Sequence, residues 1–394
     1  PNAPQTANNA ATPAASASPE TARKTAPTDL EQLAKRIVTQ SANVREGDIV
    51  LIDGGARDLE LLENIATDVQ EVGGDPLVGI DSDRMTKKYF AEVPEKYDSA
   101  ERKVQMALAR LANVIITIDS NETEGLLADV PPARRAARAK SFQGVGDELR
   151  RRNVRTVEVG NELYPTAWRA KRFGMAQDEF ARAFWDAVNV DYTSLQQAGD
   201  RARVALAGDE VHITHPNGTD LKVSIRGREA GVSDGIISPD DERKGAGNVN
   251  VFLPAGEVYV APVVGTASGK FVIDQTYFEG KEVTGLTLTF EGGKLTSMTG
   301  AGAGFDALKA DYDAAGEGKD IFGFVDIGIN PNFRLSGASK LGNWISAGMV
   351  TVGTGNNTWA GGDNNSTGGV AGHQPGCTVT IDGRVVVENG TLKQ

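Results

Sequence analysis

The sequence has 394 residues, 40% hydrophobic and 24% charged, so it is long enough for two or three domains of an ordinary globular protein. Its formal net charge of -12 argues against nucleic acid as a general partner, because phosphate binding needs a clustered basic surface. No apolar run reaches the roughly 18 residues of a membrane span, and the single cysteine, Cys377, excludes an intrachain disulfide.

Residues 1–27 form a low-complexity segment rich in Ala, Pro, Asn and Thr, with no aromatic residue. This composition buries too little apolar surface to fold alone, so we expect a tail. Extended, it reaches on the order of 90 Å, which is long enough to dock on a neighbouring subunit. The chain starts at Pro1, which fits removal of an export signal. We therefore expect a secreted or cell-envelope protein.

Residues 28–208 predict an α/β domain. A capping box at Thr28 and Glu31 opens a helix over residues 29–41, and apolar strands at 48–53, 76–80, 113–119 and 155–159 alternate with amphipathic helices. Such strands indicate an open parallel sheet covered on both faces. The glycine pair after the first strand lacks the spaced glycines of nucleotide-binding loops, so no cofactor-binding motif is expected. Three helical segments, broken near Gly174 and Asn189, complete this domain.

Residues 209–394 predict a mostly β domain. From Glu210 onward β-branched alternation and glycine dominate, and Pro216-Asn217-Gly218 between two strands predicts a hairpin. The stretch 250–262 reads as strand, turn and strand, and it places one carboxylate, Glu257, where the second strand begins. From the local sequence alone, Glu257 is either a solvated turn residue or a ligand.

The wording of that stretch, Pro-Ala-Gly-Glu-Val-Tyr-Val-Ala-Pro at residues 254–262, resembles the signature of the aminopeptidase T family of metallopeptidases, in which this glutamate binds metal. The likeness extends over most of residues 29–390. It implies an N-terminal α/β domain, a homodimer, and a site that holds two zinc or cobalt ions with five or six ligands. The metals would position a water and polarise a peptide carbonyl.

The resemblance places the other ligands on positions where this sequence mostly departs from the family. Asp326 stands where the family has glutamate, and its side chain is one methylene shorter. Thr351 replaces a histidine, Thr358 a tyrosine and Pro375 an aspartate, whereas His373 is retained. A hydroxyl is a weak ligand for zinc or cobalt, and proline has no side-chain donor. The expected metal ligands are therefore Glu257, Asp326 and His373.

Two functions remain open on this basis. If residues 348–383 are aligned differently with the family motifs, Asp363, His215 or Asp382 becomes a metal ligand instead. The protein is then an active aminopeptidase acting on peptides. In the register above, too few donors remain, so we expect little or no bound metal and identify no catalytic residue. The second function is then structural: an aminopeptidase T-like fold that self-assembles into a filament or tube, with the tail of one subunit on the next.

Overall fold

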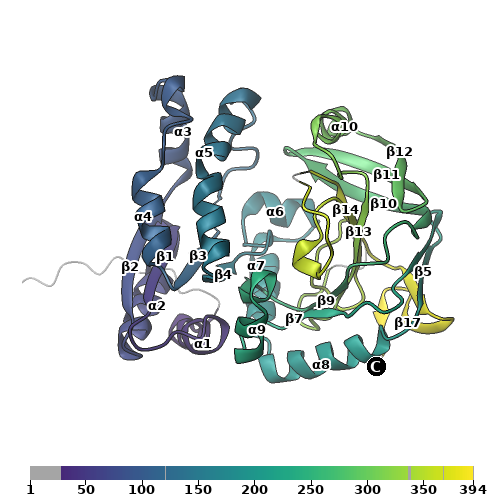
Figure 1. The fold of residues 1–394 in the computed structure, drawn as a ribbon, viewed down its shortest axis with the longest axis horizontal. Coiled ribbons are helices and arrows are strands. Elements are labelled where there is room, and N and C mark those ends of the chain that lie inside the picture. Colours follow the sequence, from purple (N-terminus) through teal and green to yellow (C-terminus); the bar gives the residue numbers. More distant parts are fainter. Residues whose placement is uncertain (1–27, 120, 336–338, 367, 394) are drawn as a thin grey trace, which may run out of the picture.

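The N-terminal part of the chain folds around a parallel sheet with the strand order β2-β1-β3-β4-β8 (Figure 1). This computed structural model describes residues 28–119, 121–335, 339–366 and 368–393, so the predicted tail lies outside the described residues. The strands are β1 (Ile49–Gly55), β2 (Asp75–Asp81), β3 (Val114–Ile118), β4 (Arg155–Val159) and β8 (Asn250–Leu253). The predicted parallel sheet is confirmed.

Helices cover both faces of this sheet. They are α1 (Leu30–Arg36), α2 (Leu59–Glu71), α3 (Asp83–Glu92), α4 (Lys103–Leu111) and α5 (Pro132–Arg151). Helix α1 packs against α2, and α4 packs against α5. Right-handed crossovers put these two pairs on opposite faces, because the chain steps outward to β2 and then back across to β3 and β4. The helix predicted over 29–41 continues beyond α1 as a π-helical turn, Ile37–Ser41.

Three helices then lead from the parallel sheet to the β-rich part. They are α6 (Ala167–Arg172), α7 (Gln177–Val188) and α8 (Tyr192–Ala205), and their breaks fall at Gly174 and Asn189 as predicted. Helix α8 runs beneath the C-terminal half in Figure 1. Among the residues that the structure describes, no helix is both long enough and apolar enough to cross a bilayer.

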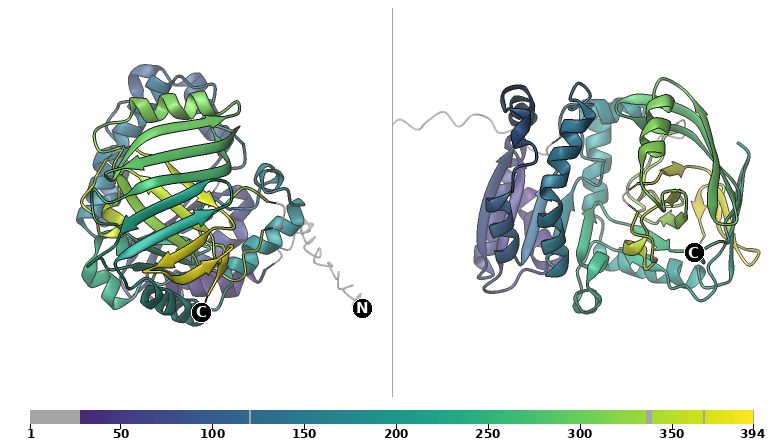
Figure 2. Two further views of the ribbon diagram at one scale, coloured as in Figure 1. Left: turned by 90° about the vertical axis from the view of Figure 1, so that its right-hand side faces the viewer. Right: turned by 45° about the horizontal axis from the view of Figure 1, so that its top comes forward.

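The C-terminal part consists of two antiparallel sheets packed face to face. The larger sheet, seen from outside in Figure 2, contains β12 (Lys294–Ala301), β11 (Lys281–Glu291), β10 (Ser268–Phe278), β6 (Thr219–Ser224), β5 (Glu210–His215), β16 (Thr378–Ile381), β17 (Arg384–Glu388) and β18 (Thr391–Leu392). The smaller one contains β15 (Ala371–Gln374), β14 (Val350–Thr354), β13 (Phe322–Gly328), β9 (Glu257–Val260) and β7 (Gly231–Ser233). Helix α10 (Phe305–Ala314) covers one end of the larger sheet (Figure 1). Ring contact between Phe290 and Phe322, with centroids 5.0 Å apart, joins the sheets.

One strand crosses between the two halves. We predicted the strand at 250–253 within the β-rich region, but β8 pairs in parallel with β4 and completes the N-terminal sheet. The next strand, β9, returns to the smaller antiparallel sheet. The periodicity of a strand indicates which of its side chains are buried but not which strand it pairs with, so this crossing could not be predicted from the sequence.

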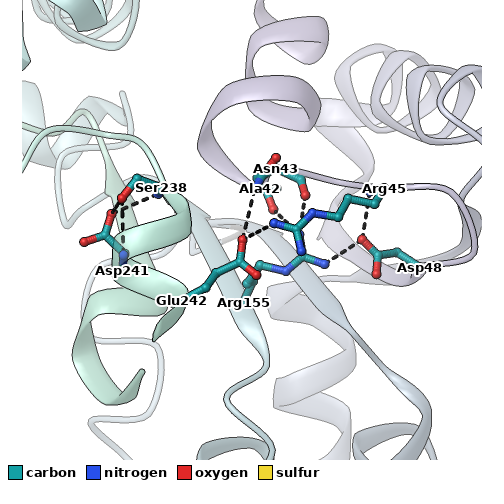
Figure 3. Close-up of polar contacts among 8 residues, drawn as sticks. All are labelled: Ala42, Asn43, Arg45, Asp48, Arg155, Ser238, Asp241 and Glu242. Carbon is teal, nitrogen blue, oxygen red and sulfur yellow. Dashed lines mark hydrogen bonds and ion pairs between the residues drawn. The ribbon is translucent and has the colours of Figure 1, made fainter. Parts of the chain in front are cut away.

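Polar contacts tie the crossing segment to the N-terminal half (Figure 3). Helix α9 (Pro239–Lys244) begins with a capping box between Ser238 and Asp241, and its Glu242 accepts hydrogen bonds from Asn43 and Arg45. Beside them, buried Arg155 at the start of β4 donates to the Ala42 and Asn43 carbonyls and forms an ion pair with Asp48. These contacts fix where β8 enters the parallel sheet.

Candidate functional site

The predicted ligands gather on one face of the smaller antiparallel sheet. Strand register places His373 opposite Thr351, Thr351 opposite Asp326, and Asp326 opposite Tyr259. Directly opposed residues project to the same face, so these four residues form a row across β15, β14, β13 and β9. Glu257 lies two residues before Tyr259 on β9 and therefore shares that face.

The turn before β9 explains the sequence Pro-Ala-Gly-Glu at residues 254–257. Gly256 adopts φ +133°, and a Cβ atom there would lie 2.7 Å from the Cβ atom of Asn330, so only glycine fits. The Asn330 side chain donates to the Ala255 carbonyl at 2.7 Å. Asn330, which follows β13, thus holds the turn before β9. Glu257 is the first residue of β9, as we predicted.

Glu257 is held by a single long hydrogen bond. The Asn161 side chain donates to it at 3.4 Å and also donates to the Pro254 carbonyl at 2.9 Å. Burial raises the pKa of Glu257 to about 7, and the Asn161 hydrogen bond only partly opposes this rise. Glu257 therefore exchanges a proton near neutral pH.

Asp326 is fully buried without a partner. Neither of its carboxyl oxygens has a hydrogen bond among the described residues. Burial, together with the neighbouring Glu257 carboxyl, raises the pKa of Asp326 well above its usual range. Burying a carboxylate away from water and from polar partners is costly, which is the physical cause of this raised pKa.

His373 and Thr351 bind each other rather than the carboxyls. The Thr351 hydroxyl lies 2.8 Å from Nδ1 of His373, and the Trp344 ring meets the imidazole edge to face with centroids 4.6 Å apart. Burial lowers the pKa of His373 to about 4, so the imidazole is neutral at pH 7. The ring is thus a neutral hydrogen-bonding group in the wall of the site.

A pocket of about 420 Å³ between the two halves of the chain reaches Glu257 and Tyr259 on β9, whereas Asp326, Thr351 and His373 are not among its lining residues. Its N-terminal wall comes from β4, β8 and the turn after β4, where the parallel strands end. Its C-terminal wall comes from β9 and two loops. The lining side chains include Glu158, Asn161, Glu162, Phe252, Glu257, Tyr259, Trp344 and Trp359.

The other sequence-predicted positions lie elsewhere. Thr358 is exposed and caps its own turn by bonding Asn356. Pro375 lines a different cavity of about 790 Å³ beside α8. Among the alternatives, His215 accepts a hydrogen bond from the Asn217 amide and Asp382 accepts from the amides of residues 209 and 210, whereas Asp363 is exposed. None of these residues lines the pocket.

Sequence reasoning missed most of the pocket wall. Asn161 and Glu162 follow β4 with positive φ angles of 44° and 60°, a conformation that non-glycine residues rarely adopt. Trp344 and Trp359 come from loops whose place the sequence does not fix. The one available signal was the aromatic position of the Glu257 signature, because Tyr259 must share the face of Glu257 on the strand.

Comparison with known proteins gives one family and one fold. A family model described as thermophilic metalloprotease (M29) matches residues 26–314. This match includes Glu257 but ends before Asp326, Thr351 and His373. No curated protein matches the chain.

Two solved structures share the fold over nearly the whole chain. Wild-type AmpT from Thermus thermophilus matches with a TM-score of 0.68 at 16% identity, covering 93% of this chain and 99% of AmpT. A 2,5-dihydroxypyridine dioxygenase from Pseudomonas putida KT2440 matches with a TM-score of 0.53 at 13% identity, covering 93% and 98%. Proteins with two different names share this fold, so the chemistry of the present chain has to be argued from its own pocket.

Proposed function

The chain belongs to the M29 family of metalloproteases, the aminopeptidase T family, and we propose that its two-metal site is eroded, so that it is not an efficient peptidase. Membership makes a bound metal plausible, and the resemblance asks for five or six ligands around two ions. The donors in and beside the row are two carboxyls, the hydroxyls of Thr351 and Tyr259, and one imidazole.

The weak donor at Thr351, in the middle of the row, carries the proposal. His373 lies two strands away from Asp326, with Thr351 between them. Neighbouring strands are about 4.8 Å apart, so the imidazole starts roughly 10 Å from the carboxyl pair. Within the described ranges, no three His, Cys, Asp or Glu side chains come together as metal ligands. This donor set does not fit two ions.

A single weakly held ion remains compatible with the proposal. Glu257 and Asp326 would hold zinc or cobalt at partial occupancy, because they are the two carboxyls on this face of the neighbouring strands β9 and β13. Two carboxylates leave most of the coordination positions of such an ion to water. We therefore expect weak binding that does not support efficient hydrolysis.

Hydrolysis of leucine p-nitroanilide with added zinc or cobalt is expected to stay at the uncatalysed rate, and metal analysis of the purified protein to give less than one ion per chain. The reason is the loss of ligands. Removing even a residue that only hydrogen-bonds to a metal ligand costs roughly 10- to 100-fold in metal affinity or activity, so the loss of the ligands themselves should cost more. Stoichiometric metal together with turnover that Glu257→Gln abolishes would instead establish the alternative, an active aminopeptidase releasing N-terminal residues.

A surface feature supports self-assembly as the second part of the proposal. Most of the large apolar side chains that are exposed in the described residues fall between residues 59 and 111, and they include Leu77, Val78 and Ile80 on β2. Strand β2 is also the edge of the parallel sheet. An exposed apolar edge strand favours association, and a second copy of the chain offers the same surface. We propose a homo-oligomer, secreted or in the cell envelope, in which residues 1–27 extend the contact to a neighbouring subunit.

Leu77→Lys is expected to reduce the particle size of the protein in light scattering, because a charge on β2 opposes the pairing of two edges. Val264→Lys is the matched control, since Val264 is also apolar and exposed but lies far along the chain from β2. Deletion of residues 1–27 tests the tail separately. Unchanged particle size in both the Leu77→Lys variant and the deletion would contradict self-assembly.

A further inference from the structure

The pocket at Glu257 has an aromatic wall. Tyr259, Trp344 and Trp359 line it, and Phe324 fills the space between the two indoles. The Trp359 ring lies 4.9 Å from Tyr259 and 5.0 Å from Phe324, centroid to centroid, and Trp344 lies 6.0 Å from Phe324. These contacts hold both indoles in place, so the wall is preformed.

Carboxyl groups gather in the same pocket, and the cation that acts on Glu158, Arg169, lies outside the pocket lining. Glu158, Glu162 and Glu257 line the pocket, and no lysine or arginine is among the described residues of its lining. None of the three forms an ion pair within the described part of the chain. Burial raises the pKa of Glu158, and nearby Asp119 and Glu162 raise it further. A cation entering the pocket would relieve this repulsion.

We propose that this pocket binds a small organic ammonium ion. Aromatic faces attract weakly hydrated organic cations through the ring quadrupole, and tryptophan is the best of the side chains for this contact. Strongly hydrated inorganic cations favour oxygen ligands instead, and rings cannot supply those. The volume of about 420 Å³ fits a small molecule. The inference rests on the proposed function in that the ligand is bound and not cleaved.

The position of the pocket supports a selective site. It lies where β4 and β8 end and where the chain crosses between its two halves, so both halves contribute to the lining. Glu162 is placed there by a turn that holds both it and Asn161 at positive φ. Such a backbone conformation is strained, and proteins retain it mostly at functional sites, where the surrounding structure holds it. The carboxylates would face the charged nitrogen, and the indoles would pack on its alkyl groups.

Titration of the full chain with choline chloride, followed by tryptophan fluorescence and calorimetry, tests the inference. We expect saturable binding that is about tenfold or more tighter than that of 3,3-dimethylbutan-1-ol, which has the same shape with carbon in place of the charged nitrogen. Sodium chloride at equal ionic strength should give no saturable signal. Equal binding of the neutral alcohol, or no saturable binding of choline, would overturn the inference.

Two variants locate the binding. Trp359→Leu and Glu162→Gln are each expected to weaken choline binding by about tenfold, the first by removing a ring face and the second by removing one charge at unchanged shape. Trp168→Phe is the control, because Trp168 lies outside the pocket lining. Unchanged affinity in both pocket variants would overturn the site. Leucine p-nitroanilide hydrolysis measured on the same preparation keeps the two proposals apart: turnover would overturn the eroded site, whereas absent choline binding without turnover would overturn only the ammonium site.

Discussion

Asp326→Val is expected to make the protein more stable at pH 7, by about 1–3 kcal/mol in the free energy of unfolding. Asp326 lies in the middle strand of the smaller sheet, with no access to solvent and, in the part of the chain that the structure describes, no hydrogen-bond partner for either carboxyl oxygen. Valine removes the cost of burying that carboxyl and suits a strand, where β-branched side chains pack well. Urea denaturation of the wild type and the variant measures the difference.

The pH dependence of stability follows from the same pair of carboxyls. The pKa of Glu257 rises from 4.5 in the unfolded chain to about 7 in the fold, and that of Asp326 also rises. Raised carboxyl pKa values stabilise the fold at low pH, and this stability is lost as the pH rises through the folded values. For Glu257 the loss between about pH 4.5 and 7 is on the order of 3 kcal/mol.

Asp326→Asn separates charge from shape in this experiment. The amide cannot ionise, so the variant should lose the Asp326 part of the pH slope without the gain in stability seen with valine, because its own donors lack partners. The prediction would be contradicted if Asp326→Val were markedly less stable than the wild type and if removing metal from the wild type abolished that difference. That result would show that a bound cation, and not a proton, satisfies the carboxyl.

Arg155→Ala is expected to lower the free energy of unfolding by about 3–5 kcal/mol, because removing one partner of a buried ion pair leaves the other charge uncompensated. Arg155 is 6% exposed and binds Asp48 together with the Ala42 and Asn43 carbonyls (Figure 3). Asn43 in turn donates to Glu242 of the crossing segment at 3.0 Å. Thermal and urea unfolding measure the loss.

An exposed pair provides the control for Arg155. Arg203 and Asp200 are 3.0 Å apart with more than half of each side chain exposed, so Arg203→Ala should change stability by no more than about 0.5 kcal/mol. Adding Asp48→Asn to Arg155→Ala should recover part of the loss, since no charged carboxylate then remains buried. Equal effects of the Arg155 and Arg203 substitutions would show that the Arg155 cluster contributes nothing to the fold.

The two proposals describe one pocket with different requirements. Metal-dependent hydrolysis needs several charged or imidazole donors within one coordination sphere, whereas an ammonium ion needs negative charge and aromatic faces over a wider volume. The row offers the Asp326 carboxyl, with Glu257 on the same face of β9, and an imidazole bonded to Thr351. The pocket wall offers Tyr259, Trp344 and Trp359. This chain's own residues therefore support binding more directly than cleavage.

Local patterns in the sequence determined the elements, the parallel sheet and the turn that delivers Glu257. Apolar runs in the first half have to be buried on both sides, and a glycine at residue 256 is required by the close approach of Asn330, so neighbouring residues carry this information. The likeness of the Glu257 signature to one family was also readable, and the family match confirmed it.

Only the tertiary structure decided which donors meet. Strand register puts Asp326, Thr351 and His373 in one row although 47 positions separate the first from the last, and it leaves Thr358 and Pro375 outside. The return of β8 to the parallel sheet, which builds one wall of the pocket, depends on pairing between residues about 90 positions apart. Alternation within a strand fixes the buried face of each element, but the choice of partner strand depends on packing across the whole chain, and the pocket is made by that choice.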